Sequence, residues 1–309
     1  MFDRVMLLTD LSDVTRLAFK PIAQVAEAFG SKVTIFHAFR GASELFYLQG
    51  EAAQLLELID DADRKRVLPK LEAFQAELKA LGVDADIDVR RGSTFDLSVD
   101  VLREKSVDLC VIAAHFYHEF TGRVSGSTTA RILKETSVPV LTVNEKFAER
   151  ETGWTGFEKV VHPIDFSDEF HDGLRAAEEF AIEVGGTVDV VHVVEPIGAQ
   201  TLTTPEGDIL LPKDIQYQIR SKLQARLSDA AHEIERVPSF WHLIEDNKPG
   251  SGVMAYADRH AADLIVLPTL ERDATRMTVL GSVVEHVIKH ARCPVLTIKR
   301  GWKPTAAIA

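Results

Sequence analysis

The sequence has little cysteine, few basic residues relative to acidic ones, and no long apolar run. Only Cys110 and Cys293 occur among 309 residues, each inside a short apolar stretch that is typical of a buried strand. We therefore expect neither a disulfide framework nor a zinc site. No apolar run approaches the roughly 18 residues that a membrane-spanning helix needs, and the N-terminus lacks the basic and then apolar pattern of a signal peptide. These absences predict a cytoplasmic protein.

Acidic residues outnumber basic ones across the chain. Lys and Arg together number 35 and Asp and Glu 47, so the formal net charge is −12. This charge opposes a broad surface for nucleic acid or an anionic membrane, and we expect neither partner. Hydrophobic residues make up 46% and charged residues 27%, which is typical of a folded globular protein. The length favours two domains.

Several catalytic motifs are also missing. The sequence contains no Gly-x-Ser-x-Gly elbow, no His-Glu-x-x-His and no Gly-x-x-x-x-Gly-Lys, which argues against hydrolase, metalloprotease and P-loop functions. An adenylating α/β enzyme would show a Ser-Gly-Gly-rich loop after its first strand, whereas residues 10–13 read DLSD. His115, His118 and Glu119 lie close together, but the equivalent stretch of the second half has no histidine. We predict a loop there, and no metal site and no catalytic residue in the chain.

The strongest positive signal is an internal repeat. The segments RVMLLTDLSD and KVVHPIDFSD place Asp10 and Asp165 155 positions apart (165 − 10). The same shift relates the following pairs: Gly30 and Gly185, His37 and His192, Asp108 and Asp263, Gly126 and Gly281, Ser127 and Ser282, and the PVLT runs at 139–142 and 294–297. A unit of this size is an ordinary domain, so we predict a tandem pair over residues 1–145 and 157–300, joined by a polar segment.

Each half alternates short apolar runs with helical patterns. In the first half the runs lie at 5–9, 33–38, 85–90, 109–114 and 140–143, and all but the third are continuously apolar. Such runs are typical of parallel strands covered on both faces. Helical spacing of apolar residues separates the runs. The alternation predicts two doubly wound α/β domains, each with a five-stranded parallel sheet and right-handed crossovers.

Local signals mark the ends of the first helix of each half. Ser12 and Ser167 stand where N-caps belong, and Gly30 and Gly185 stand where the helices should stop. Pro21 falls well inside the first helical pattern, so we expect a kink there.

Four motifs recur in the same order in both halves. They are an aspartate after strand one, a His-Ala or His-Val step ending strand two, a Gly-Ser pair opening the last helix, and the PVLT strand. Together they resemble the universal stress protein family in its tandem form. The resemblance implies adenine-nucleotide α-hydrolase-like domains and, in one branch of the family, ATP at the carboxyl ends of the strands. The candidate nucleotide-site residues carried over are Asp10, Ala38, Gly126 and Ser127 in the first half, and Asp165, Val193, Gly281 and Ser282 in the second. Turn and cap formation is the alternative role of the aspartates, serines and glycines.

The family's ATP-binding branch carries Gly, two residues, Gly, nine residues, then Gly with Ser or Thr. Here Ala113 and Phe116 stand at the first two glycine positions of the first half, and Pro268 and Glu271 at those of the second. Phe116 adds bulk, Pro268 removes an N–H donor, and Glu271 and Asp273 bring negative charge. These departures argue against ATP as a cofactor, more strongly in the second half.

Two functions therefore stay open. One is a non-enzymatic stress-response or regulatory protein with degenerate nucleotide sites, and the other is an ATP-binding member with slow or no ATPase activity. The apolar last strands, 138–143 and 295–298, would be exposed sheet edges. We expect the two halves to pair through these strands, and a homodimer is a further arrangement in which such edges are covered.

Overall fold

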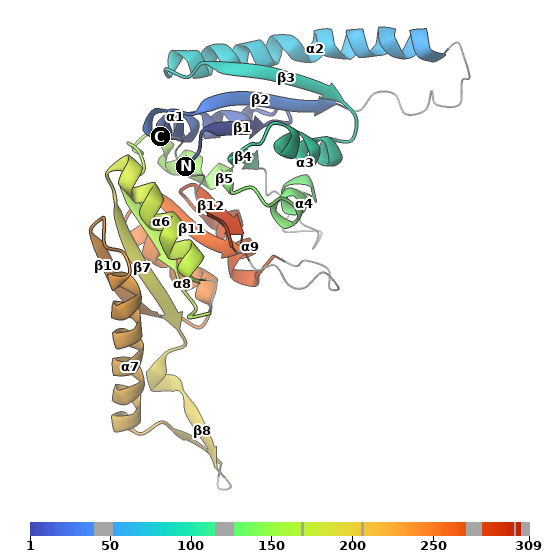
Figure 1. Ribbon diagram of the computed structural model, residues 1–309. Helices are drawn as coiled ribbons and strands as arrows, with labels where there is room; N and C mark the ends of the chain where they lie inside the picture. Colours follow the sequence, from blue (N-terminus) through green and yellow to red (C-terminus); the bar gives the residue numbers. More distant parts are fainter. Residues whose placement is uncertain are drawn as a thin grey trace. The chain divides into compact units, whose positions relative to one another are not determined.

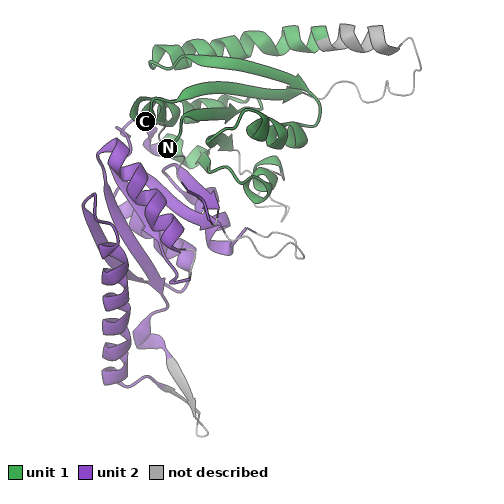
Figure 2. Ribbon diagram, viewed as in Figure 1, with its two compact units in different colours: residues 1–148, 305–309 green, residues 149–304 purple. Residues whose placement is uncertain are grey.

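A computed structural model describes residues 1–39, 52–114, 127–167, 170–204, 207–269, 280–299 and 301–303 (Figure 1). For residues 52–60, 127, 201–204 and 207–209 the backbone alone is described. By its internal contacts the chain divides into unit 1, residues 1–148 with 305–309, and unit 2, residues 149–304 (Figure 2).

Unit 1 is a doubly wound α/β domain. Its parallel strands are arranged in the order β5-β4-β1-β2-β3. Helices α1 and α2 pack together, as do α3 and α4, which is the two-layer cover of a doubly wound sheet. The elements are β1 (Arg4–Leu8), a 3₁₀ helix (Asp13–Ala18), α1 (Phe19–Phe29), β2 (Lys32–Phe39), α2 (Ala52–Ala80), β3 (Ala85–Arg91), α3 (Thr94–Glu104), β4 (Leu109–Ala114), α4 (Ser127–Glu135), β5 (Val140–Asn144) and a 3₁₀ turn (Glu145–Phe147).

Unit 2 repeats this plan with the strand order β10-β7-β6-β11-β12. Its elements are β6 (Lys159–Pro163), α6 (Phe170–Val184), β7 (Thr187–Val194), a 3₁₀ turn (Ile197–Ala199), β8 (Thr201–Thr204), β9 (Gly207–Leu210), α7 (Lys213–His232), β10 (Ser239–Glu245), α8 (Pro249–Arg259), β11 (Leu264–Thr269), α9 (Ser282–His290) and β12 (Val295–Lys299); a short helix, α5 (Ala148–Glu151), precedes them. The antiparallel hairpin β8–β9 between β7 and α7 is an element that the sequence analysis missed. The predicted fold class, two doubly wound domains with five parallel strands each, is confirmed.

The 155-residue shift holds in the backbone. β1 and β6, β2 and β7, α3 and α8, β4 and β11, α4 and α9, and β5 and β12 begin and end at positions related by it. Positive φ angles recur at equivalent non-glycine positions, with Leu11 at 66° and Phe166 at 60°. In each unit an aspartate of the repeat, Asp108 or Asp263, accepts a hydrogen bond from the first N–H of β1 or β6. The two halves are therefore copies in conformation as well as in motif order.

The ends of the first helix test three local predictions. Gly30 ends α1 in the left-handed conformation at φ 64°, and Gly185 has φ 66° after α6, so both stops are confirmed. The predicted kink at Pro21 is wrong. Residues 13–18 form a 3₁₀ helix and α1 begins at Phe19, so Pro21 lies in the first turn of α1. In that turn an N–H has no helical partner, and a proline therefore costs no hydrogen bond. Ser12 precedes the 3₁₀ helix, but its side chain makes no cap hydrogen bond.

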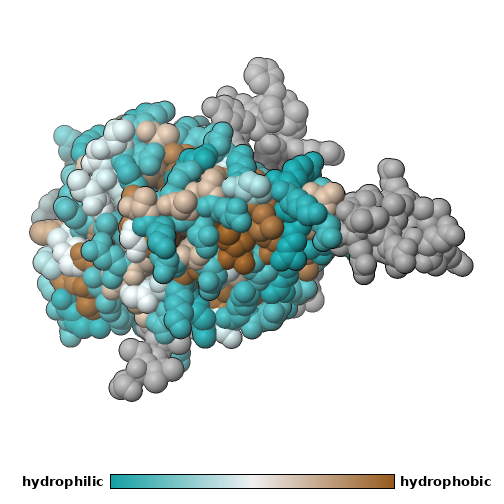
Figure 3. Space-filling model, turned by 90° about the horizontal axis from the view of Figure 1, so that it is seen from above, coloured by the Kyte–Doolittle hydropathy of each residue, from teal (hydrophilic) through white to brown (hydrophobic). Residues whose placement is uncertain are grey.

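The core of each unit consists of apolar strand residues and aromatic side chains from the helices. Phe19 and Phe74 meet edge to face across α1 and α2 with ring centroids 5.4 Å apart. In unit 2, Phe157, which precedes β6, and Phe180 of α6 meet edge to face at 5.0 Å. The face shown in Figure 3 is mostly hydrophilic with small apolar areas. Within the described ranges, no helix combines the length and apolar character required to cross a membrane.

Candidate functional site

The strand order reverses at one place in each unit. In unit 1 the chain runs outward from β1 through β2 to β3 and then returns to β4 on the other side of β1, so the switch point lies between β1 and β4. In unit 2 it lies between β6 and β11. In open α/β sheets ligands bind in the crevice beyond the carboxyl ends of the strands at this point. Asp10 and Asp165 follow the carboxyl ends of β1 and β6 and are exposed there.

Asp10 is engaged by its own turn. Its Oδ1 accepts a hydrogen bond from the Ser12 N–H at 2.8 Å, and the Leu11 N–H donates to Thr9 Oγ1 at 2.9 Å. Thr9 Oγ1 in turn lies 2.8 Å from Thr15 Oγ1 in the interior. These bonds hold Leu11 at a positive φ, where a leucine is strained. The turn-forming role is therefore present, and a ligand contact by Asp10 remains a prediction.

The equivalent turn of unit 2 has one more hydrogen bond. Asp165 Oδ1 accepts from the Ser167 N–H at 3.0 Å and from the Ser167 hydroxyl at 2.6 Å. In unit 1 the hydroxyl of Ser12 is buried and has no hydrogen-bond partner among the residues that the structure describes. The two copies thus differ at the candidate site: among the described residues, the serine hydroxyl has a hydrogen-bond partner in unit 2 and none in unit 1.

The strand-end histidines tie neighbouring strands together. The Nδ1–H of His37 donates to the Thr9 carbonyl at 2.8 Å, and that of His192 to the Ile164 carbonyl at 2.7 Å. Burial lowers the pKa of His192, and its bond to Ile164 and the charge of Asp165 partly oppose that shift. Both histidines are satisfied, as residues at a strand end usually are.

Ala38 and Val193 follow these histidines. Ala38 is buried and Val193 half-buried. A side chain at Gly252 of α8 would lie 2.7 Å from Val193 Cγ1, so the valine side chain packs against that helix. Any contact of either residue with a ligand remains a prediction.

The Gly-Ser pairs are only partly described. Gly126 lies outside the described residues, and Ser127 is the first residue of α4. Gly281 precedes α9 at φ −56°, and a Cβ there would meet Val284 Cγ2 at an ordinary 4.0 Å. Neither its backbone conformation nor its packing against the described residues therefore requires a glycine at 281. Ser282 begins α9 and is exposed, and the first N–H groups of that helix have no partner within the helix itself.

Unit 2 carries an aromatic and cationic cluster that unit 1 lacks. The ring of Phe166 lies 4.5 Å from that of His192, and the guanidinium carbon of Arg226 on α7 lies 4.1 Å from the Phe166 centroid. The repeat places Leu11 opposite Phe166, so unit 1 has no ring there. The sequence analysis missed this cluster because the repeat does not fix the register of α7.

His162 interrupts the sheet at the switch point of unit 2. β1 and β4 pair over four residues, from Val5–Leu109 to Leu8–Ile112. β6 and β11 pair over only two, because Pro163 lacks an N–H and the His162 ring takes the Val266 carbonyl at 2.9 Å. The other ring nitrogen lies 3.2 Å from the Phe170 carbonyl. His162 is fully buried, and burial lowers its pKa.

Two of the four positions that break the family's glycine motif are described, and both lie near the ends of strands. Ala113 is opposite Val143 in the β4–β5 pair, and Pro268 is opposite Ile298 in the β11–β12 pair. Phe116, Glu271 and Asp273 lie outside the described residues, as do His115 and His118.

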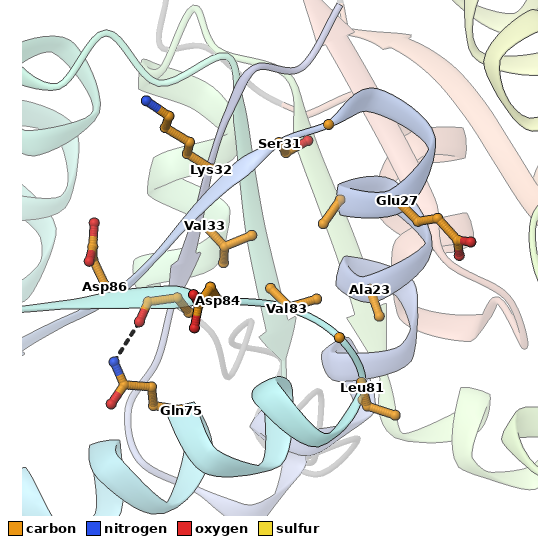
Figure 4. Close-up of a pocket in the computed structure, with 14 residues that line it drawn as sticks. Ala23, Glu27, Ser31, Lys32, Val33, Gln75, Leu81, Val83, Asp84 and Asp86 are labelled. Carbon is orange, nitrogen blue, oxygen red and sulfur yellow. Dashed lines mark hydrogen bonds between the residues drawn. The ribbon is translucent and has the colours of Figure 1, made fainter.

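An open groove of about 860 Å³ lies at the opposite edge of unit 1. It is formed by the ends of α1 and α2 and the starts of β2 and β3, and Figure 4 shows Glu27, Lys32, Asp84 and Asp86 around it. Gln75 Nε2 donates to the Ala85 carbonyl across its floor at 2.5 Å. These are the amino ends of the strands, so the groove is separate from the switch point.

The model of the universal stress protein family matches residues 1–144 and again residues 156–299. Universal stress protein E of Photorhabdus laumondii is 20% identical over 313 residues, which covers 96% of this chain and 95% of that protein. A universal stress protein of Methanocaldococcus jannaschii is 28% identical over 153 residues, or 48% of this chain and 85% of the relative. A crystal structure of a universal stress protein from Archaeoglobus fulgidus, 17% identical, superposes with a TM-score of 0.69 over 97% of this chain and all of its own, which shows a shared fold.

Proposed function

Because this chain belongs to the universal stress protein family, we propose that it is a cytoplasmic stress-response regulator that acts by binding and not by catalysis. We further propose that neither of its two clefts holds ATP tightly. The resemblance supplies the biological class, and the residues at the carboxyl edges supply the argument against tight nucleotide binding.

The observation that carries the proposal is the loss of the close-approach positions in both units. A triphosphate needs several convergent N–H donors and room for the backbone to come near. At the end of β11 Pro268 has no N–H to offer, and at the end of β4 Ala113 carries a Cβ where a glycine would leave space. A remaining helix N-terminus contributes about 0.3–1 kcal/mol toward an anion. Micromolar affinity requires about 8 kcal/mol.

The hydrogen bonds of the two aspartates also argue against tight nucleotide binding. Asp10 and Asp165 each use one carboxylate oxygen on the turn that follows their own strand. A ligand hydroxyl or amino group would have to share that oxygen or use the second one. The turn alone accounts for an aspartate at both positions.

Calorimetric titration of the full chain with Mg-ATP tests the proposal. We expect no saturable binding in the low micromolar range. Saturable binding that is lost in Asp10→Ala but kept in Asp84→Ala, an exposed aspartate at the other edge of the same domain, would refute it. A second variant, Ala113→Gly with Phe116→Gly, restores both glycines of unit 1 and should create measurable affinity. Failure of this variant to bind would show that the missing glycines are not the reason.

One observation favours the alternative, an ATP-binding protein with slow or no ATPase activity. The buried Ser12 hydroxyl has no partner in the described part of unit 1, and a buried hydroxyl without a hydrogen bond costs about 1–3 kcal/mol. Because the hydroxyl is buried, a ligand atom would satisfy it only after a movement of the turn that carries Ser12. Mass spectrometry of the denatured, freshly purified protein separates the two cases, because retained nucleotide at a stoichiometry near one per chain supports the alternative.

A further inference from the structure

Two histidines stand one helical turn apart on α9. His286 and His290 are half-buried, and their ring centroids are 4.6 Å apart. Residues four apart lie on the same face of a helix, and the backbone between them is fixed by helical hydrogen bonds. The two imidazoles are therefore held side by side by one rigid element.

The other copy of the domain shows that this pair is not a feature of the fold. The repeat places Arg131 opposite His286 and Glu135 opposite His290. In unit 1 the Arg131 guanidinium lies over the Phe95 ring at 3.6 Å and 3.9 Å from the Glu135 carboxylate. An ordinary ion pair and a cation–π contact thus suffice to complete the same helix in unit 1.

A third position differs together with these two. Gly250 of α8 stands where unit 1 has Phe95. A Cβ at Gly250 would lie 2.9 Å from His286 Cδ2 and 3.0 Å from its Cγ, so only a glycine leaves room for the imidazole. The atoms of His286 nearest to this Cβ are all carbons. Three positions thus differ together between the units: unit 2 has Gly250, His286 and His290 where unit 1 has Phe95, Arg131 and Glu135.

The nitrogens of His286 are accessible. Within the described ranges neither of them has a hydrogen-bond partner, and neither is among the buried polar atoms that lack one. Both must therefore be in contact with solvent. The neighbouring Glu285 and Lys289 bind each other at 2.6 Å, so the glutamate is already paired.

We propose that His286 and His290 chelate a divalent late transition-metal ion, with Cu²⁺ bound most tightly and Ni²⁺ and Zn²⁺ more weakly. Imidazole nitrogens suit these ions, and affinity rises toward Cu²⁺ along the divalent series. Metal–nitrogen bonds of about 2.0–2.1 Å let one ion bridge two imidazoles held at this spacing. Among the described residues no group of three or more metal-ligating side chains gathers. Within the described ranges, water is the remaining ligand for the other coordination positions. This site is separate from the switch-point clefts and goes beyond the proposed function.

The test is titration of the untagged full chain with Cu²⁺ alone, followed by calorimetry and by electron paramagnetic resonance. We expect one site whose spectrum shows two equivalent nitrogen ligands. His290→Ala should weaken binding by more than the roughly 10- to 100-fold that loss of an outer-shell partner costs. The matched control is His232→Ala, an exposed histidine of α7, which should leave the site unchanged.

Two exchanges between the copies keep the test decisive. His286→Arg with His290→Glu installs the pair of unit 1, so the helix should remain folded and the two-nitrogen signal should disappear. Phe95→Gly with Arg131→His and Glu135→His transfers the set to unit 1 and should add a second site. The proposal is overturned if the wild-type chain shows no two-nitrogen signal, or if that signal survives in the first variant. It is also overturned if the second variant folds but binds no more Cu²⁺ than the wild-type chain.

Discussion

The imidazole of His162 occupies the space that Gly173 leaves open on α6. A Cβ at Gly173 would overlap His162 Cε1 and lie 2.6 Å from Nε2. Unit 1 fills the same volume with Leu7 and Ala18. In unit 1 the helix carries the larger alanine and the strand carries a leucine. In unit 2 the helix carries a glycine and the strand carries a histidine whose ring contacts two carbonyls.

This relationship predicts a strong effect of one added methyl group. Gly173→Ala should destabilise the protein by about 1–3 kcal/mol or more, because the ring is fully buried and cannot move aside. His162→Leu with Gly173→Ala restores the pair of unit 1 and should recover most of the loss. Urea unfolding measures both. Gly198→Ala is the control, since among the described side chains a Cβ there meets only Gln216 Oε1, at 3.8 Å. An equal loss in the control would contradict the packing argument.

The same histidine predicts a pH dependence of stability. Burial lowers the pKa of His162 below its ordinary value of 6.5, so the unfolded chain binds more protons than the folded one below that pH. The free energy of unfolding should therefore fall as the pH drops below about 6.5. Burial also lowers the pKa of His192 and His242, which act in the same direction. The double variant His162→Leu with Gly173→Ala should show a shallower slope, and identical slopes would exclude His162 as a source.

A buried tyrosine and a buried aspartate of unit 2 are hydrogen-bonded, and we expect this bond to contribute to the free energy of unfolding. Tyr256 Oη donates to Asp189 Oδ2 at 2.9 Å, and the residues are 5% and 4% exposed. Tyr256→Phe leaves that carboxylate oxygen without this donor and should cost about 1–3 kcal/mol.

The repeat again offers the replacement, because unit 1 has Thr34 and Val101 at these positions. Asp189→Thr with Tyr256→Val should cost less than the sum of the two single changes in a double-mutant cycle of urea unfolding. Strict additivity would mean that the hydrogen bond contributes nothing. Tyr217→Phe, at a side chain that is 73% exposed, should be neutral.

Pairing of the two halves through their last strands stays a prediction. β5 and β12 each end the strand order of their own unit, and both are largely apolar. Exposed apolar edges are avoided in stable proteins. Val140→Asp with Val295→Asp should loosen the two domains, with a larger radius of gyration in X-ray scattering and faster proteolysis of the joining segment. Lys79→Asp with Lys222→Asp adds negative charge at exposed positions and should change neither quantity.

The repeat made much of the fold predictable from sequence. A single shift relates the boundaries of four of the five strands in the two units, and the two glycine stops follow from the left-handed conformation that ends a helix. Pro21 was misread because an apolar helical pattern does not distinguish a 3₁₀ turn from the start of an α-helix. The β8–β9 hairpin lies between β7 and α7, in a stretch where the sequence analysis found no motif shared by the two halves, so the repeat carried no information about it.

The candidate site was predictable only where its residues are neighbours in sequence. The turns at Asp10 and Asp165 fall in this class, because their hydrogen bonds span two residues. The stack of Arg226 on Phe166 joins residues sixty positions apart, and nothing in a single sequence fixes which turn of α7 faces that ring. The contact between His162 and Gly173 could have been predicted from the differences between the two halves. Leu7 is replaced by a larger histidine and Ala18 by a smaller glycine, and two such changes compensate each other when the residues are in contact.

The short β6–β11 ladder gives the two domains different ways of opening. Exposing the switch point of unit 1 means separating backbone pairs that extend to the last residue of β1. In unit 2 the last two of those pairs are replaced by a single imidazole bonded to the Val266 carbonyl. Fewer backbone hydrogen bonds therefore have to break at this point of unit 2, and amide exchange measured residue by residue reports such local openings. We therefore expect the strand pair at the switch point of the second domain to exchange its amides faster than that of the first.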